Sequence, residues 1–108
     1  MALYQTITYS TTGTKDSINT DPSIAPFNAT LAVTLTGGTA TYKAQWSISA
    51  PDVADADAIW FDSTDIPANT SASKVSYLTA PVGRVRLIIA ALSGGNLVLQ
   101  LAQGYTKN

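Results

Sequence analysis

The sequence alternates between apolar and polar positions with a period of two over much of its length. The longest such run covers residues 40–50, where every even position is apolar and every odd position is polar. Successive side chains of a β-strand point to opposite faces, so this run predicts a strand with one buried face, which would hold Trp46. Residues 29–36 show a similar pattern. Because Gly37 and Gly38 lie between the two runs, we expect a tight β-hairpin here.

A second predicted hairpin lies closer to the C-terminus. Val85, Leu87, Ile89 and Ala91 would share one face of the first strand, and Leu97, Leu99 and Leu101 would share one face of the second. Ser93-Gly94-Gly95-Asn96 separates the two runs. The opposite face of these two runs is also partly apolar, with Ile88 on the first run and Val98 on the second. Strands that are apolar on both faces are usually covered on both. The outer face of this hairpin is therefore expected to lie under another part of the chain or under another subunit.

The rest of the chain gives weaker strand signals at residues 3–10, 59–61 and 73–79, and no sustained helical periodicity. Two stretches rich in turn residues, 11–28 and 51–72, separate them. We predict an all-β protein, an antiparallel β-sandwich of about seven to eight short strands with two long irregular loops. Its topology would be of the jelly-roll or the immunoglobulin-like kind. The 108 residues form one predicted domain, in which residues 1–28 could be an extended arm that reaches a neighbour.

The composition argues against several functions. The chain has no histidine and no cysteine, which removes the commonest general base and thiolate chemistry, and we expect no catalytic residues and no enzymatic activity. The chain has six basic and seven acidic residues, so it lacks the excess of positive charge that nucleic-acid binding requires. The longest apolar run has six residues, 87–92, whereas a membrane-spanning helix needs about 20. We therefore expect neither a nucleic-acid partner nor a membrane.

The acidic residues, all of them aspartates, raise the question of a metal site. Asp52, Asp55 and Asp57 lie close together in the sequence, and oxygen-rich loops bind Ca²⁺. Their spacing does not match an EF-hand loop, and aspartate is also a common turn and helix-capping residue. We favour the structural interpretation, with no cofactor, and retain calcium as the weaker alternative. No spacing singles out the carboxylate pair that a glycosidase would need.

Several residues are candidates for contacts between proteins. Trp60 and Phe61 are neighbours on a short predicted strand, so they should point to opposite faces, one into the core and one toward a partner. Arg84 and Arg86 share a strand face. They could form ion pairs with the aspartate-rich loop, either within one subunit or across an interface, or they could stay solvated and contribute little. With Ile88 and Val98, these four residues make up the predicted interface.

The second half of the chain resembles small virion proteins of tailed bacteriophages. The residues that carry the resemblance are Trp60-Phe61-Asp62, the segment 81–87, Ala91-Leu92-Ser93-Gly94-Gly95, the segment 97–101 and Gln103-Gly104. Within that group, capsid cement or decoration proteins are nearest in size. The resemblance implies a structural protein that binds the major capsid protein or another virion protein, often as a homotrimer. Such a protein is made in the cytoplasm of the bacterial host and is located on the capsid surface of the virion.

A second function remains open. Tail and baseplate modules of phages use similar sandwiches, so the chain could instead bind a carbohydrate or a receptor. In that case Trp60, Phe61 and the aspartate-rich loop would form the site, with calcium as an optional ligand.

Overall fold

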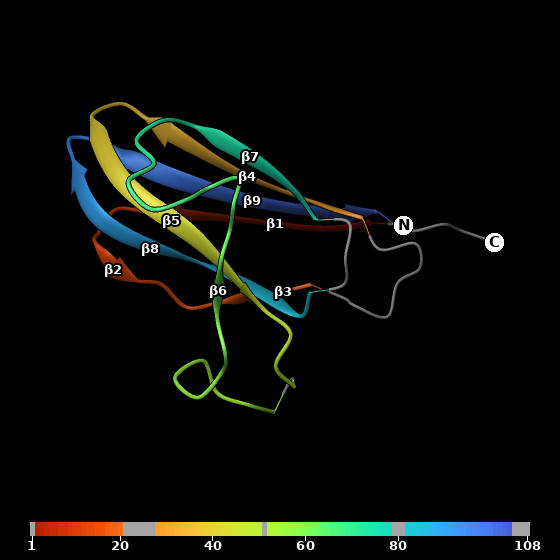
Figure 1. The fold of residues 1–108 in the computed structure, drawn as a ribbon. Coiled ribbons are helices and arrows are strands. Elements are labelled where there is room, and N and C mark those ends of the chain that lie inside the picture. Colours follow the sequence, from red (N-terminus) through yellow and green to blue (C-terminus); the bar gives the residue numbers. More distant parts are fainter. Residues whose placement is uncertain (1, 21–27, 51, 79–81, 105–108) are drawn as a thin grey trace.

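The computed structural model describes residues 2–20, 28–50, 52–78 and 82–104, and within them it is all-β. Two antiparallel sheets pack face to face (Figure 1), which confirms the predicted sandwich. No helix of the described residues is long and apolar enough to cross a membrane. The strands are β1 (Ala2–Tyr9), β2 (Gly13–Thr14), β3 (Ile18–Asn19), β4 (Ala29–Thr36), β5 (Thr39–Ser47), β6 (Phe61–Asp62), β7 (Lys74–Leu78), β8 (Arg84–Ser93) and β9 (Asn96–Gly104).

The two sheets have different edges. The four-stranded sheet has the order β1-β9-β4-β7, and the five-stranded sheet has the order β2-β8-β5-β6, with β3 also paired to β8. The core lies between the sheets, because the inward positions of the four long central strands are buried and apolar. These core residues are Ala29, Leu31 and Val33 on β4, Ala40, Tyr42 and Ala44 on β5, Val85, Leu87 and Ile89 on β8, and Leu97, Leu99 and Leu101 on β9.

Both predicted hairpins are wrong, although the predicted strands are present. β4 and β5, which Gly37 and Gly38 connect, lie in different sheets, and so do β8 and β9. β4 instead pairs with β9 up to Thr36 and Asn96, and β5 pairs with β8 from Thr39 and Ser93 onward. The pairing register therefore continues unchanged past the glycines. The four strands form one long two-stranded ribbon that bends over at its middle, visible at the left of Figure 1.

The glycines at this bend allow the two chains to touch backbone to backbone. A Cβ on Gly38 would lie 2.1 Å from the carbonyl oxygen of Ser93, a separation that atoms do not tolerate. Gly37, Gly38 and Gly94 also have positive φ angles, which favour glycine. Glycine pairs predict a change of chain direction, but the direction can be a reversal within one sheet or a bend from one sheet to the other. Here it is the bend.

The predicted N-terminal arm is also wrong for the part of residues 1–28 that the structure describes. β1 pairs with β9 over its whole length, from Ala2 opposite Gly104 to Tyr9 opposite Leu97. The short strands β2 and β3 pair with β8. Residues 21–27 lie outside the described part of the chain. The N-terminal segment therefore belongs to both sheets of the sandwich, because its alternating apolar side chains cover the core, as the partly buried Ile7 and Tyr9 do.

Candidate interaction surfaces

The outer face of the four-stranded sheet is a continuous surface whose outward side chains carry no charge. Its outward side chains, taken from the pairing register, are Tyr4, Thr6 and Thr8 on β1, Val98, Gln100 and Ala102 on β9, Thr30, Ala32 and Thr34 on β4, and Val75 and Tyr77 on β7. Tyr4, Ala102, Thr30 and Tyr77 lie side by side in one row across all four strands. Tyr4 is 75% exposed and Tyr77 is 68% exposed. Two large aromatic rings in water are typical of interaction surfaces.

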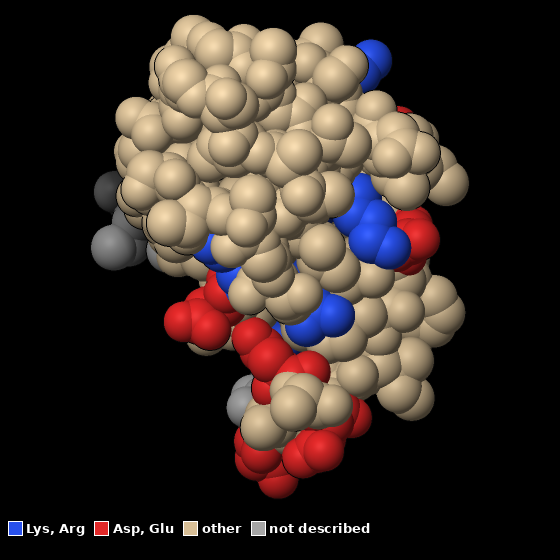
Figure 2. Space-filling model, turned by 90° about the vertical axis from the view of Figure 1, so that its left-hand side faces the viewer, with Lys and Arg blue, Asp and Glu red and all other residues tan. Residues whose placement is uncertain are grey.

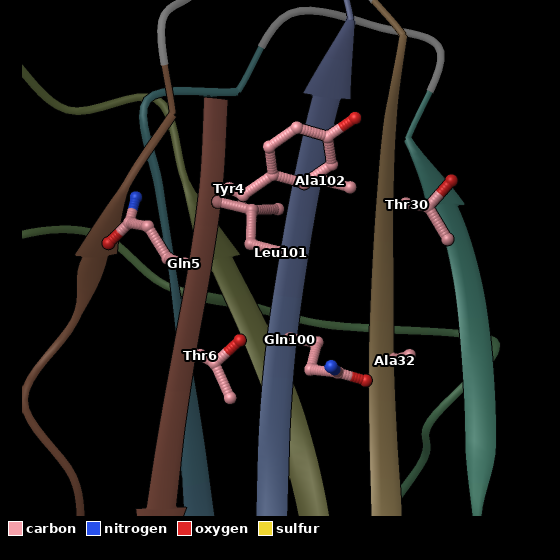
Figure 3. Close-up of a pocket in the computed structure, with 8 residues that line it drawn as sticks. All are labelled: Tyr4, Gln5, Thr6, Thr30, Ala32, Gln100, Leu101 and Ala102. Atoms are coloured by element: carbon pink, nitrogen blue, oxygen red, sulfur yellow. The ribbon is translucent and has the colours of Figure 1, made fainter. Parts of the chain in front are cut away.

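This outer face contains a shallow hollow of about 320 Å³ (Figure 3). The hollow forms because Ala32 and Ala102 have short side chains and lie beside the larger Tyr4 and Gln100. The hydroxyl of Thr6 and the amide of Gln100 border it, and the ring of Tyr4 lies at one end. The hollow can therefore accept an uncharged group that makes both apolar contacts and hydrogen bonds.

Charge is concentrated on the opposite side of the molecule. Figure 2 shows aspartates gathered at the lower end, on the loop that projects between β5 and β6, while the upper part, over the four-stranded sheet, carries few charges. Asp52 and Asp57 are exposed on this loop. Asp55, on the same loop, is the only one of the three whose side chain forms an ion pair within the described residues.

Arg84 anchors the projecting loop to the five-stranded sheet. Its side chain is buried, its Nη1 lies 2.9 Å from Oδ1 of Asp55, and its Nη2 donates to the carbonyl oxygen of Ala50 at 2.7 Å. The backbone N–H and the hydroxyl of Ser17 donate to the same carboxylate at 3.0 and 2.8 Å. Of the alternatives for Arg84, the structure shows the ion pair within the subunit.

The same bonds set the ionisation of Asp55. Partial burial raises the pKa of this carboxyl, but the hydrogen bonds from Ser17 and Arg84, together with the charge of Arg84, outweigh burial and hold its pKa below the ordinary value. Hydrogen bonds from Gln45 and Lys43 likewise lower the pKa of Asp62. Both shifts favour the ionised form. A general acid needs the opposite shift, so neither carboxyl is tuned for acid catalysis.

Arg86 and Trp60 cover each other. The guanidinium carbon of Arg86 lies 4.0 Å from the centre of the Trp60 ring, a cation–π contact. The Nε of Arg86 donates to Gln45, and the indole N–H of Trp60 donates to the carbonyl oxygen of Asp55 at 3.0 Å. Desolvation lowers the pKa of Arg86. One face of the Trp60 ring and its only donor are therefore already engaged, which weakens the case for a carbohydrate platform at this residue.

Phe61 is the more exposed of the two neighbouring aromatic residues. Its ring stacks on Trp46 at a centroid distance of 4.9 Å, and 47% of the residue remains exposed. Trp46 itself is only half-buried and packs against the edge of the core, because β5 ends one residue later and Ile48, the next apolar position, is 66% exposed. Neither Trp60 nor Phe61 lies in the core. The expectation that one of them would be buried there is therefore wrong.

Ile88 and Val98 lie on the outer faces of the two sheets. Ile88 pairs with Thr14 and with Lys43 in the five-stranded sheet, and Val98 pairs with Thr8 and with Thr34 in the four-stranded sheet. Both are half-buried by these neighbouring strands. Their predicted role in contacts between subunits stays a prediction. The sequence did not indicate that Ile88 and Val98 would lie on different sheets. The strand pairing shows that the neighbours of Val98 are uncharged, whereas Ile88 lies beside Lys43.

The structure does not bring the calcium candidates Asp52, Asp55 and Asp57 together as ligands. Across the part of the chain that the structure describes, no group of three or more His, Cys, Asp or Glu side chains could hold a metal ion. Asp55 is directed toward Arg84 and Ser17 instead. Asp55 thus has structural partners, while the expectation that the loop binds no metal stays a prediction.

Comparison with known proteins gives one weak structural match. No family model matches the sequence, and no curated protein does. A solved chain described under "Bacillus endospore appendages form a novel family of disulfide-linked pili" is similar over 98% of this chain and 88% of that chain, with 14% identity and a TM-score of 0.49. A similarity at this level says nothing of what this chain does.

Proposed function

We propose that this protein is a non-enzymatic structural protein that binds a neighbouring protein through the outer face of its four-stranded sheet. The observation that supports the proposal is the row of outward side chains from Tyr4 to Tyr77, which has two exposed aromatic rings and no charge. Removing water from an uncharged face costs little free energy, whereas burying unpaired charges costs much more. The face therefore suits a lasting contact with another protein surface.

The finer form of this proposal is decoration of a bacteriophage capsid, with the major capsid protein as the neighbour. It rests on the sequence resemblance described above and on the low charged fraction of 12%. A decoration protein binds many equivalent positions on a symmetric particle, so contacts that are weak individually add up through avidity when the protein is oligomeric. The trimeric state that the resemblance implies is part of this finer proposal.

A charge placed at the centre of the outer face tests the proposal. Gln100 is exposed on the central strand β9, so Gln100→Lys should leave the fold intact while it introduces a charge into the contact. The matched control is Ala56→Lys, an exposed position on the projecting loop at the other end of the molecule. Binding to purified phage capsids that lack the protein is measured by co-sedimentation.

We expect wild-type protein and Ala56→Lys to bind alike, and Gln100→Lys to bind at least about tenfold more weakly, which corresponds to about 1.4 kcal/mol. Equal binding of Gln100→Lys and wild-type protein would refute the role of this face. A wild-type protein that binds no capsid would refute the capsid proposal, while leaving a different protein neighbour to be tested with the same pair of variants.

A second candidate function is carbohydrate binding at the hollow beside Tyr4. The exposed Tyr4 ring, the amide of Gln100 and the hydroxyl of Thr6 are groups that recognise neutral sugars. Glycan-array binding by wild-type protein that is lost in Tyr4→Ala and retained in Trp60→Ala would support this function and place it at the hollow. Loss of glycan binding in Trp60→Ala alone would instead place the sugar site on the projecting loop.

A further inference from the structure

β1 is a long edge strand whose outer side is open. It stands at the end of the four-stranded sheet and pairs only with β9. Among the residues that the structure describes, no hydrogen bond joins the backbone of residues 4–9 to any group other than β9. An open edge of this kind presents a row of unpaired N–H and C=O groups that can pair with another strand.

The hydrogen bonds of β4 show which backbone groups of the sheet point in which direction. The N–H of Leu35 donates to the hydroxyl of Ser73, at the start of β7, over 3.0 Å. Backbone groups alternate in direction along a strand, so Leu35 directs its N–H and C=O toward β7 while Thr34 and Ala32 direct theirs toward β9.

The same alternation continues through β9 to the edge. Gln100, which lies opposite Ala32, directs its backbone groups toward β4, so Leu99 directs its groups toward β1. The register of β1 with β9 has no irregularity. It follows that Tyr4, Thr6 and Thr8 direct their N–H and C=O groups outward, away from the sheet, while their side chains lie on its outer face.

β1 has none of the features that usually protect an edge strand. Edge strands are commonly short, bulged, or marked by charged residues or proline. The eight residues of β1 contain no charge and no proline, and they are rich in β-branched and aromatic residues. The opposite edge of the same sheet, β7, has five residues and begins with Lys74, and the edge strands β2, β3 and β6 of the other sheet have two residues each.

We propose that β1 pairs with β1 of a second copy of this chain, antiparallel, about a twofold axis at Thr6. This axis places Thr6 opposite Thr6 and Tyr4 opposite Thr8, twice, so that all three residues with outward backbone groups are paired. An antiparallel pair of this kind exchanges two hydrogen bonds per facing pair, or about six in total. The two sheets then join into one eight-stranded sheet with a single uncharged outer face.

The side chains of β1 favour a second copy as the occupant. Tyr4 and Thr8 are equally far from Thr6, so the strand is complementary to itself under a twofold axis. Each copy would contribute a Tyr4–Thr8 contact, an aromatic side chain opposite a β-branched one, which is a favourable cross-strand pair. Because β1 carries no charge, bringing two copies together creates no repulsion along the paired stretch. Lys15 lies against the ring of Tyr9, beyond the paired residues.

This pairing goes beyond the proposed function, because it concerns the edge of the sheet and not its outer face. A dimer can form through β1 whether or not the outer face binds a capsid protein. Failure of the β1 dimer therefore leaves the binding role of the outer face intact, and the two are measured with different variants. The dimer and the trimer of the finer capsid proposal exclude each other, and the sedimented mass decides between them.

Proline at position 6 tests the pairing. The N–H of Thr6 takes no part in the β1–β9 ladder, so Thr6→Pro keeps the bonds of the sheet while it removes the central outward donor and places a ring at the axis. Thr6→Val is the matched control, because it retains the backbone N–H and nearly the same side-chain shape. Sedimentation velocity over a wide concentration range gives the mass, and near-ultraviolet circular dichroism verifies the fold of each variant.

We expect wild-type protein and Thr6→Val to sediment as dimers and Thr6→Pro as a monomer, with a dimer dissociation constant raised at least about 100-fold. Hydrogen exchange of the wild-type protein provides an independent measurement that does not require Thr6→Pro to fold. In the dimer the amides of Tyr4, Thr6 and Thr8 should exchange slowly, and dilution to the monomer should make them fast.

Any one of the following results would overturn the proposal. The first is a wild-type chain that stays monomeric at the highest concentration reached. The second is an oligomer, such as a trimer, in which the amides of Tyr4, Thr6 and Thr8 exchange as fast as in the monomer. The third is Thr6→Pro that is folded and associates as strongly as wild-type protein. Protection of these amides only in the presence of a different protein would likewise show that the occupant is not a second copy.

Discussion

The carbonyl oxygen of Gly37 lies where a side chain on Gly95 would have to be. A Cβ built on Gly95 would be 1.9 Å from this oxygen, and a Cβ built on Gly38 would be 2.1 Å from the carbonyl oxygen of Ser93. These two contacts join the halves of the bent ribbon at the point where β4 continues into β5 and β8 continues into β9. The passage of both chains from one sheet to the other therefore depends on backbone packing with no room for a methyl group.

Gly95→Ala should consequently destabilise the protein by at least about 2 to 3 kcal/mol, because backbone atoms cannot move aside as a flexible side chain can. The matched control is Gly83→Ala, where a new Cβ would make ordinary contacts at 3.5 and 3.7 Å with the carbonyl oxygens of Ser47 and Ser49. That variant should change stability by less than about 1 kcal/mol. Urea unfolding of both variants measures the difference. Equal effects would mean that the bend tolerates a side chain.

The Asp55–Arg84 pair should make the protein sensitive to acid. The folded-state pKa of Asp55 lies below the unfolded value of 3.8, so its stabilising contribution is present above pH 3.8 and is lost as the pH falls through the folded pKa. Asp55→Asn should lower the free energy of unfolding at neutral pH by about 2 kcal/mol, because it leaves the buried Arg84 guanidinium with weaker partners.

The pH dependence provides the control for that prediction. The difference in stability between wild-type protein and Asp55→Asn should shrink as the pH falls below 3.8 and the wild-type carboxyl becomes protonated. Asp62→Asn is the comparison variant, since the pair of Asp62 with Lys43 is exposed and should be weakened by salt. A constant difference between wild-type protein and Asp55→Asn across the acid range would contradict the assigned pKa direction.

The strands were predictable from the sequence because apolar residues at every second position indicate a strand with one buried face. Residues 29–36 and 97–101 alternate in the sequence, and the same positions alternate between buried and outward in the structure. The pairing between strands was not predictable, because the glycine pairs that indicate a hairpin also permit a bend between sheets. Local sequence does not say whether Thr36 and Thr39 will find partners in one sheet or in two.

The candidate surfaces were predictable only in part. The pairing of Arg84 with the aspartate-rich loop followed from charge, and the sequence left open whether it would lie within one subunit. The uncharged face was missed, because Tyr4 and Tyr77 are 73 positions apart and become neighbours in one row only through the order β1-β9-β4-β7. The alternation in β1 and β7 indicates which of their side chains share a face. It identifies a common surface only when the two strands are known to lie in one sheet.

Removal of residues 1–10 should impair folding itself. β1 covers the edge of β9, and its side chains Ile7 and Tyr9 pack against the core, so the deletion exposes apolar surface and unpairs half the ladder of a central strand. We expect the midpoint of thermal unfolding to fall by more than about 10 °C, or cooperative unfolding to disappear. A deletion variant with unchanged thermal stability would show instead that this segment serves only contacts with neighbours.

Tyr42 should make the protein sensitive to alkali. Its side chain is fully buried and its hydroxyl donates to the carbonyl oxygen of Ala72. Burial raises the pKa of Tyr42 to about 12, compared with 10.0 for the unperturbed group. Because the folded state resists ionisation of Tyr42 while the unfolded state does not, the contribution of this group to stability is fully present below pH 10.0 and is lost as the pH rises toward 12. The loss is on the order of 2 to 3 kcal/mol.

Tyr42→Phe isolates this effect from the other tyrosines. The variant loses the hydrogen bond to Ala72, so it should be less stable than wild-type protein by about 1 kcal/mol at neutral pH. Above pH 10 the wild-type protein should lose this advantage and become the less stable of the two, since phenylalanine cannot ionise. Unfolding measured at a series of alkaline pH values locates the crossing, and the difference in tyrosinate absorbance between the two proteins reports when Tyr42 ionises. If Tyr42 ionises near pH 10 while the wild-type protein is still fully folded, its hydroxyl is accessible to water and is not buried.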